Sequence, residues 1–152
     1  MNASNHSSDL RDRDVRRRFD CAAERFDEAD FVHGMTRDGL LERLRPMTAE
    51  AAVVLDLGAA TGSTIPLLQK RFRRARVIAV DSSPRMLQLA RRKRTLLSKR
   101  HAVLGDARAL PFANASVDVV FSNLMLPWLD RPESVFAEVA RVLRKDGLFV
   151  FS

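Results

Sequence analysis

The stretch VVLDLGAATG (residues 53–62) decides the fold of this chain. Its apolar first half, with two adjacent valines, is typical of a strand buried on both faces, and the small residues that follow let another backbone or a ligand come close. Apolar side chains then recur at helical spacing over residues 65–72. The loop therefore joins the carboxyl end of a strand to the amino end of a helix, which is where open α/β sheets bind nucleotides.

A turn rich in small residues is not by itself a ligand site, because tight strand-to-helix turns need small residues for steric reasons. Gly58, Ala60 and Gly62 form a Gly-x-Ala-x-Gly pattern, unlike the Gly-x-Gly-x-x-Gly of pyrophosphate-binding folds or the P-loop. A nucleoside ligand without phosphates fits this loop better. The stretch resembles motif I of the S-adenosylmethionine-dependent methyltransferases, with Ala60 where many members carry a second glycine.

Length and composition predict one globular domain, since the chain has 152 residues of which 46% are apolar. We find no apolar run long enough to span a membrane and no secretory pattern at the start, and acidic residues interrupt the early arginines. The cytoplasm is the expected location. The single cysteine, Cys21, excludes an internal disulfide and is expected to pack as a small apolar residue; the scattered histidines predict no metal site.

Positive charge is concentrated between Lys70 and Arg100, where twelve basic residues face Asp81 alone and give a net charge of +11, against +7 for the whole chain. One interpretation is that these residues form solvated outer faces of two helices. The other is an acidic macromolecular partner, either a carrier protein or nucleic acid.

In chain order, residues 1–12 are expected to be a disordered tail and residues 13–50 a helical cap of two helices broken near Gly34. Residues 51–152 alternate strands with helices, and the predicted strands cover 53–57, 75–81, 102–105, 117–122 and 148–151. Ser83-Pro84 opens the second helix of this part as N-cap and first helical position, and the last helix is expected to bury Phe136 and Leu143.

The alternation of strands and helices predicts an α/β, Rossmann-like, doubly wound parallel sheet of order 3-2-1-4-5. Methyltransferases of this fold usually have seven strands, so we expect a sheet truncated before the last two, with an open apolar edge on its fifth strand through which copies could associate.

Acidic and polar residues end three of these strands and so converge on one edge of the sheet. Asp81 lies at the end of the second strand, where a carboxylate accepts hydrogen bonds from ribose hydroxyls; alternatively it stabilises the dipole of the helix that follows. Asp106 and Ala107 resemble the family segment whose acid and backbone N–H hold adenine, although a turn-forming aspartate is an alternative. The predicted cofactor-binding residues are Asp56, Gly58, Ala59, Ala60, Gly62, Asp81, Ser82, Met86, Asp106, Ala107 and Asn123.

Two further stretches resemble the bacterial malonyl-carrier-protein O-methyltransferases of biotin synthesis. They are the leader RFDCAAERFD (residues 18–27), with Phe26 where that family usually has tyrosine, and SNLMLPW (residues 122–128), in which a tryptophan follows Ser-Asn-Leu. The second stretch also resembles a related mitochondrial complex I assembly factor that modifies an arginine. The resemblance implies S-adenosylmethionine as cofactor and an acidic acyl carrier protein as partner. Phe26 and Trp128 are the candidate substrate residues, with an ordinary core aromatic as the alternative for Trp128.

The implied reaction is attack of a substrate carboxylate on the sulfonium methyl group. An ionised carboxylate is already a nucleophile at pH 7, so no general base is required and no catalytic residue is assigned. Two alternatives remain open: a S-adenosylmethionine-binding assembly or scaffold module without methyl transfer, and a nucleic-acid methyltransferase. Nucleic acid is the less favoured partner, because no Pro-Pro-Tyr-like segment follows the fourth strand.

Overall fold

The computed structural model describes residues 3–46, 50–93 and 101–152, and its centre is a five-stranded parallel sheet. The strand order is β3-β2-β1-β4-β5, as the sequence predicts. The strands are β1 (Val53–Leu57), β2 (Arg76–Asp81), β3 (His101–Leu104), β4 (Val117–Ser122) and β5 (Leu143–Phe151). In the central strand, Val54 pairs with Val77 on one side and Val119 on the other. All three valines are fully buried, which explains the continuous apolar run of β1.

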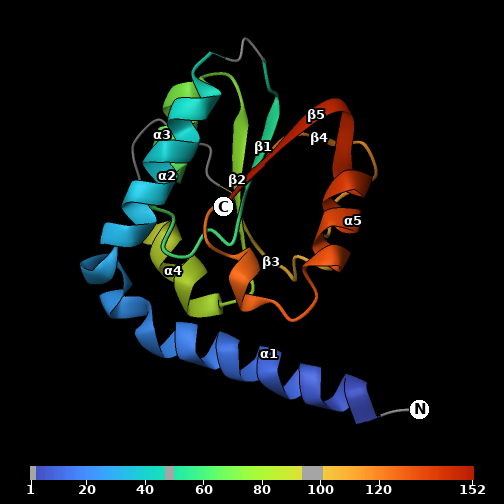
Figure 1. Cartoon of the computed structure of the whole chain (residues 1–152). Coiled ribbons are helices and arrows are strands. Elements are labelled where there is room, and N and C mark those ends of the chain that lie inside the picture. Colours follow the sequence, from blue (N-terminus) through green and yellow to red (C-terminus); the bar gives the residue numbers. More distant parts are fainter. Residues whose placement is uncertain (1–2, 47–49, 94–100) are drawn as a thin grey trace.

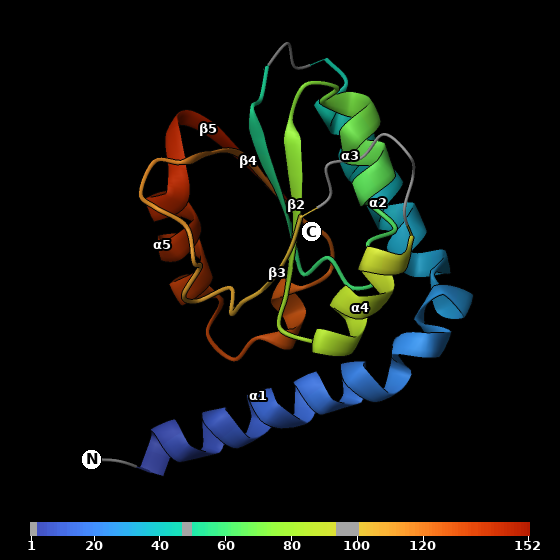
Figure 2. The same ribbon diagram turned by 180° about the vertical axis from the view of Figure 1, so that it is seen from behind.

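Helices cover both faces of the sheet, so the molecule has three layers (Figures 1 and 2). One face carries α2 (Phe31–Leu44), α3 (Ile65–Arg71) and α4 (Pro84–Arg92), and the other carries α5 (Pro132–Val142). Leu44, Leu68 and Phe72 pack on the first face, and Val135, Val139 and Val142 pack on the second. The Ser83 hydroxyl accepts a hydrogen bond from the backbone N–H of Met86, which confirms the predicted N-cap of α4.

The N-terminal helices cap the carboxyl ends of the strands. α1 (Ala3–Ala22) runs across one end of the molecule and continues through the 3₁₀ helix η1 (Ala23–Ala29) into α2 (Figure 1). α1 begins at Ala3 and so includes most of residues 1–12, for which the sequence analysis expects a disordered tail. No glycine or proline interrupts residues 3–22, and a helix that is held down by its C-terminal half extends at little cost.

Two details of the cap differ from the sequence analysis. The break between helices lies at Asp30, between η1 and α2, and Gly34 is inside α2. A glycine in a helix interior costs only about 1 kcal/mol, which the packing of Leu40 and Leu44 against the sheet outweighs. Cys21 is exposed rather than packed, because it faces away from the sheet on α1.

The last strand begins earlier than predicted. β5 starts at Leu143, which pairs with Val117, and the regular register resumes only where Leu148 pairs with Val119. Asp146 and Gly147, which precede the predicted strand 148–151, therefore form a bulge inside β5, with Asp146 at a φ of 64°. Leu143 accordingly belongs to the strand and not to α5. Phe136 is also not buried; it is 40% exposed and packs edge-on against Phe149 and Phe151 of β5.

No helix in residues 3–46, 50–93 or 101–152 is both long and apolar enough to cross a membrane.

Candidate cofactor site

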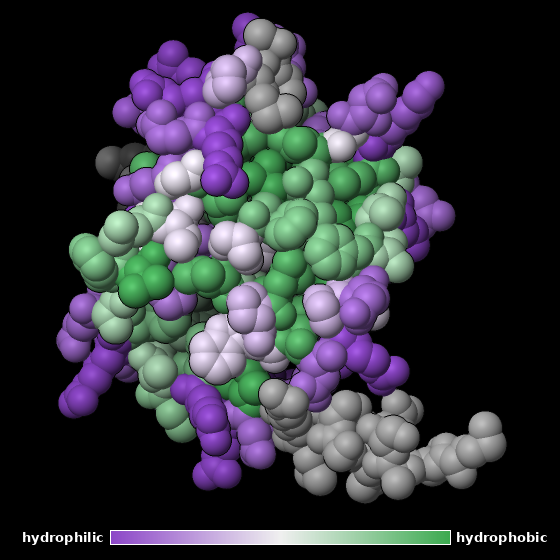
Figure 3. All heavy atoms as spheres, in the orientation of Figure 1, coloured by the Kyte–Doolittle hydropathy of each residue, from purple (hydrophilic) through white to green (hydrophobic). Residues whose placement is uncertain are grey.

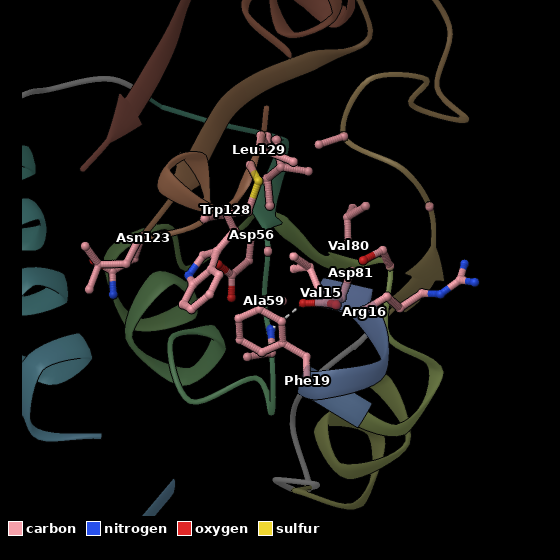
Figure 4. Close-up of a pocket in the computed structure, with 18 of the residues that line it drawn as sticks. Val15, Arg16, Phe19, Asp56, Ala59, Val80, Asp81, Asn123, Trp128 and Leu129 are labelled. Atoms are coloured by element: carbon pink, nitrogen blue, oxygen red, sulfur yellow. Dashed lines mark hydrogen bonds between the residues drawn. The ribbon is translucent and has the colours of Figure 1, made fainter. Parts of the chain in front are cut away.

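A cavity of about 430 Å³ opens at the carboxyl ends of the strands. Its floor comes from the ends of β1 and β2 and from the loops after β1, β3 and β4, and its outer wall comes from α1, η1 and α2 (Figure 4). Its volume falls within the range of small-molecule sites, and its position at the edge of a parallel sheet is the usual one for a nucleotide.

Asp81 ties the end of β2 to the loop after β1. One carboxylate oxygen accepts a 2.8 Å hydrogen bond from the backbone N–H of Ala60, and the other accepts one of 2.8 Å from Ser83. Burial raises the pKa of Asp81, while these backbone N–H groups act in the opposite direction. Backbone N–H groups of Ala60, Ser82 and Ser83 leave at least one of the carboxylate's about four acceptor positions free, so Asp81 can accept a donor from a ligand.

Asp56 is the most deeply buried acid that lines the cavity. Its Oδ2 atom is buried without a hydrogen-bond partner among the described residues. Burial raises the pKa of Asp56 to about 7, with a further increase from the charge of Asp81 and a decrease from Arg37. A buried carboxylate oxygen without a partner is costly, and Oδ2 of Asp56 is free to accept a donor.

The backbone of residues 58–62 explains why the loop needs small residues. Gly58 has a φ of 75°, and a Cβ atom there would lie 2.6 Å from Cγ of Met125. Ala60 adopts a φ of 47°, a conformation that costs a residue with a side chain some strain. The N–H of Ala60 donates to Asp81, which holds the residue in this conformation. A glycine at this position would avoid the strain.

Asp106, the predicted adenine-binding acid, lines the cavity together with an arginine that the sequence analysis does not single out. Arg108 donates to Asp106 from its backbone N–H (2.9 Å), from Nε (3.0 Å) and from NH2 (2.6 Å). Its NH1 group reaches Asp12 of α1 at 2.5 Å. These contacts lower the pKa of Asp106, chiefly through the Arg108 side chain.

Aromatic rings form the side of the cavity beneath α1. Phe19 lies edge-on to Trp128 with ring centroids 5.1 Å apart, and it also approaches Phe26 at 6.2 Å (Figure 4). Trp128 is 49% exposed, which rules out the ordinary core aromatic considered for it. Phe26 and Trp128 belong to one wall, and Phe19, which contacts both, is a cavity residue that the sequence analysis does not single out.

The structure brings most of the predicted cofactor-binding residues together. The cavity is lined by Asp56, Gly58, Ala59, Ala60, Asp81, Ser82, Asp106, Ala107 and Asn123. Asn123 donates to the backbone oxygen of His33 in α2 at 2.9 Å and accepts from the Ser152 hydroxyl at 3.1 Å, so it links the end of β4 to the helical cap.

Two predicted residues do not line the cavity. Gly62 packs against α4, where an added Cβ would lie 2.9 Å from that of Ala90. Met86 is fully buried in the core instead of facing a ligand. Arg37 is a further cavity residue that sequence reasoning missed; it bonds to Asp30 at 3.0 Å and to Ser63 at 3.2 Å.

None of the described basic residues from Lys70 to Lys93 lines the cavity, and Arg94, Lys99 and Arg100 lie outside the described residues. Arg73, Arg74 and Arg76 are exposed at the start of β2, which is the opposite end of that strand from Asp81. The cations that line the cavity are instead Arg13, Arg16, Arg37 and Arg108. Within the described ranges, no group of three or more metal-ligating side chains is close enough to hold a metal ion.

Sequence and structure comparisons agree on one family. The family model of the Methyltransferase domain matches residues 55–151. The malonyl-[acyl-carrier protein] O-methyltransferase of Halorhodospira halophila is 42% identical over 138 residues, which cover 91% of this chain and 47% of that protein. The chain thus spans about half the length of the curated relatives it matches.

Solved structures show the same fold. The complex between the Haloferax volcanii Trm112 methyltransferase activator and a methyltransferase gives a TM-score of 0.78 at 30% identity, covering 88% of this chain and 58% of the matched one. Geranyl diphosphate methyltransferase in complex with GPP and sinefungin gives 0.66 at 25% identity, covering 76% and 42%. The five-stranded parallel sheet, the cavity at its carboxyl edge and the match over residues 55–151 establish that the chain belongs to the methyltransferase domain family.

Proposed function

We propose that the chain is the cofactor-binding part of an enzyme that transfers a methyl group from S-adenosylmethionine to a carboxylate on a carrier-bound acyl chain such as malonyl-acyl carrier protein. The observation that carries the proposal is the 42% identity to a malonyl-[acyl-carrier protein] O-methyltransferase over 91% of the chain. The geometry of the cavity supports it independently.

The residues of the cavity fit the chemistry of S-adenosylmethionine. The remaining acceptor capacity of Asp81 suits the ribose hydroxyls, and the loop of Gly58 and Ala60 lets the ligand approach the backbone closely. Asp106 and the backbone N–H of Ala107 suit the amino donor and ring acceptor of adenine. The orphaned Oδ2 of Asp56 suits the ammonium group of the methionine part. Each polar end of the cofactor thus meets a complementary group.

The cofactor supplies an electrophilic methyl group on a sulfonium sulfur. When bound, the cofactor would give this methyl group to the oxygen of an acceptor carboxylate, and its sulfur would keep the electron pair of the broken bond. No proton moves, so the chain needs no general base, and its task is to orient the reactants and exclude water. The rings of Phe19, Phe26 and Trp128 provide an apolar wall for this purpose, and their faces favour a sulfonium cation.

Transfer of label is the direct test. The full-length protein is incubated with methyl-labelled S-adenosylmethionine and, separately, malonyl-acyl carrier protein, the unacylated carrier and transfer RNA. We expect label only in the malonyl carrier, and we expect Asp81→Ala to reduce the initial rate at subsaturating cofactor. Label in RNA would identify a nucleic-acid methyltransferase, and binding of the cofactor without label in any acceptor would favour a scaffold module.

A further inference from the structure

The inner face of α1 is the feature from which a further role emerges. Its residues recur at helical spacing and all face the cavity or the core domain: Asp12, Val15, Arg16, Phe19 and Asp20. Both acids at the ends of this series make contacts with the core domain. Asp20 accepts hydrogen bonds from the Ser83 hydroxyl and, at 3.3 Å, from the backbone N–H of Arg85, both at the start of α4. Asp12 pairs with Arg108. α1 is thus fastened over the cavity at two points two helical turns apart.

Arg108 contacts both the inner and the outer wall of the cavity. Its NH1 group holds Asp12 on the outer wall, while Nε and NH2 hold Asp106 on the inner wall. The planar guanidinium fixes the directions of these donors, so the position of α1 and the orientation of the Asp106 carboxylate are set by a single side chain.

The geometry leaves Asp106 able to bind a ligand. Three N–H groups of Arg108 make four contacts with the carboxylate, of which the one from Nε to Oδ2, at 3.2 Å, is the longest. The side chain of Asp106 is 46% exposed, so a ligand donor can reach Oδ2 in place of this longest contact. Arg108 therefore orients this acid while leaving Oδ2 accessible to a ligand.

We propose that Arg108 is a positioning residue of the cofactor site, which orients Asp106 toward the adenine amino group and at the same time holds α1 closed over the cavity through Asp12. This inference rests on the proposed cofactor site. It implies that cofactor affinity and closure of α1 are thermodynamically coupled through one arginine.

Two measurements separate these roles. Affinity for S-adenosylhomocysteine is determined by calorimetric titration. Closure of α1 is followed without ligand by acrylamide quenching of the fluorescence of Trp128, the single tryptophan of the chain. If α1 opens, Phe19 no longer packs against the Trp128 ring, and acrylamide reaches the ring more easily. The variants are Arg108→Ala, Arg108→Lys, Asp12→Asn and the double variant Asp12→Asn with Arg108→Ala. Asp14→Asn and Arg17→Ala are matched controls, since both residues are exposed on α1 and neither lines the cavity.

We expect Arg108→Ala to raise quenching and to weaken affinity by about tenfold. Asp12→Asn should raise quenching as much but weaken affinity by only about threefold, because Asp106 stays oriented. Adding Asp12→Asn to Arg108→Ala should change nothing further, since the shared partner is already gone. Arg108→Lys keeps the positive charge but not the planar set of donors, so its quenching and its affinity should lie between those of the wild type and Arg108→Ala. Both controls should behave as the wild type.

Three outcomes would overturn the inference: unchanged quenching in Arg108→Ala, additive effects in the double variant, or tighter binding by Arg108→Ala, which would show that Arg108 competes with the ligand for Asp106. If the wild type does not bind S-adenosylhomocysteine at all, the proposed function fails and the adenine-directed role of Arg108 fails with it. The quenching series needs no ligand and decides separately whether Arg108 holds α1.

Discussion

The carboxylate of Asp81 and the backbone N–H of Ala60 are joined by a hydrogen bond of 2.8 Å, so the acid that ends β2 also shapes the loop that follows β1. The two segments are neighbours because β1 and β2 pair in parallel with Leu57 opposite Val80. Asp81 therefore has a structural role and a proposed ligand-binding role, and a useful variant must distinguish them.

Replacing Asp81 by asparagine and by alanine makes this distinction. Asn retains one acceptor oxygen for a backbone N–H but loses the charge, whereas Ala loses both. We expect both variants to bind S-adenosylhomocysteine at least about tenfold more weakly, because charge-assisted hydrogen bonds to the ribose are lost or weakened. Asp81→Ala should also lose about 1–3 kcal/mol of unfolding free energy, and Asp81→Asn should lose less, because its amide oxygen still accepts one of the two backbone N–H groups. Calorimetric titration and urea denaturation measure the two effects, and unchanged affinity in Asp81→Asn would remove the ribose assignment.

Gly58 and Gly39 offer a matched test of the loop. Gly58→Ala should destabilise the chain by about 2–3 kcal/mol, because the positive φ is strained and the new Cβ meets Met125. Gly39 lies in α2 with no atom within 4 Å of an added Cβ. Gly39→Ala should therefore stabilise the chain by about 0.5–1 kcal/mol through helix propensity. Circular dichroism during urea denaturation gives both values. A loss below about 0.5 kcal/mol for Gly58→Ala would contradict the close contact with Met125.

Sequence patterns predicted the sheet well because its signals are local. Runs of valine and leucine mark buried strands, and an acid or polar residue at the end of a strand identifies the shared edge without knowledge of any contact. Ser83 followed by proline likewise marks a helix start. These features determined the strand order and brought nine of the eleven predicted cofactor-binding residues to one cavity.

The remaining differences come from tertiary contacts. Gly58 and Gly62 look alike in sequence, but one faces the cavity and the other packs against Ala90 of α4. Phe136 fits the apolar stripe of α5, yet its exposure depends on where β5 places its own phenylalanines. Arg108 is joined to Asp12 across 96 residues, a separation that no local pattern encodes. The helical spacing of Asp12, Val15 and Phe19 was the available signal for the inner face of α1.

The apolar surface at β5 leads to a prediction about association. Green, hydrophobic side chains gather across the face of Figure 3 that lies over β5, where Phe151 is 43% exposed beside Phe136. Among the described strands, β5 pairs only with β4, so the outer backbone groups of β5 have no strand partner there. We expect the 152-residue chain to self-associate, and Phe151→Lys to raise the concentration at half-association about tenfold or more.

Sedimentation velocity over a concentration series measures this association. Met35→Lys is the matched control, because Met35 is also exposed, at 63%, but belongs to α2 and not to β5. An equal effect of the two substitutions would indicate that added charge alone prevents association and that the β5 surface has no special part in it.

Asp56 leads to a prediction about pH. Its pKa in the folded chain is about 7, above the ordinary aspartate value of 3.8. The folded state therefore binds a proton at Asp56 more tightly than the unfolded state does. The resulting stabilisation is fully present below pH 3.8 and is lost as the pH rises to about 7, and its upper limit is roughly 4 kcal/mol.

Asp56→Asn isolates this contribution, because an amide has a similar shape and does not titrate. Acids with lowered pKa values, such as Asp118 and Glu138, produce the opposite slope, but they do so equally in both proteins. We therefore expect the free energy of unfolding of Asp56→Asn, minus that of the wild type, to increase between pH 4 and pH 8. Urea denaturation at intervals of pH measures this difference. A flat difference would show that Asp56 titrates normally when folded, and its orphaned oxygen would then no longer mark the place of a cationic ligand group.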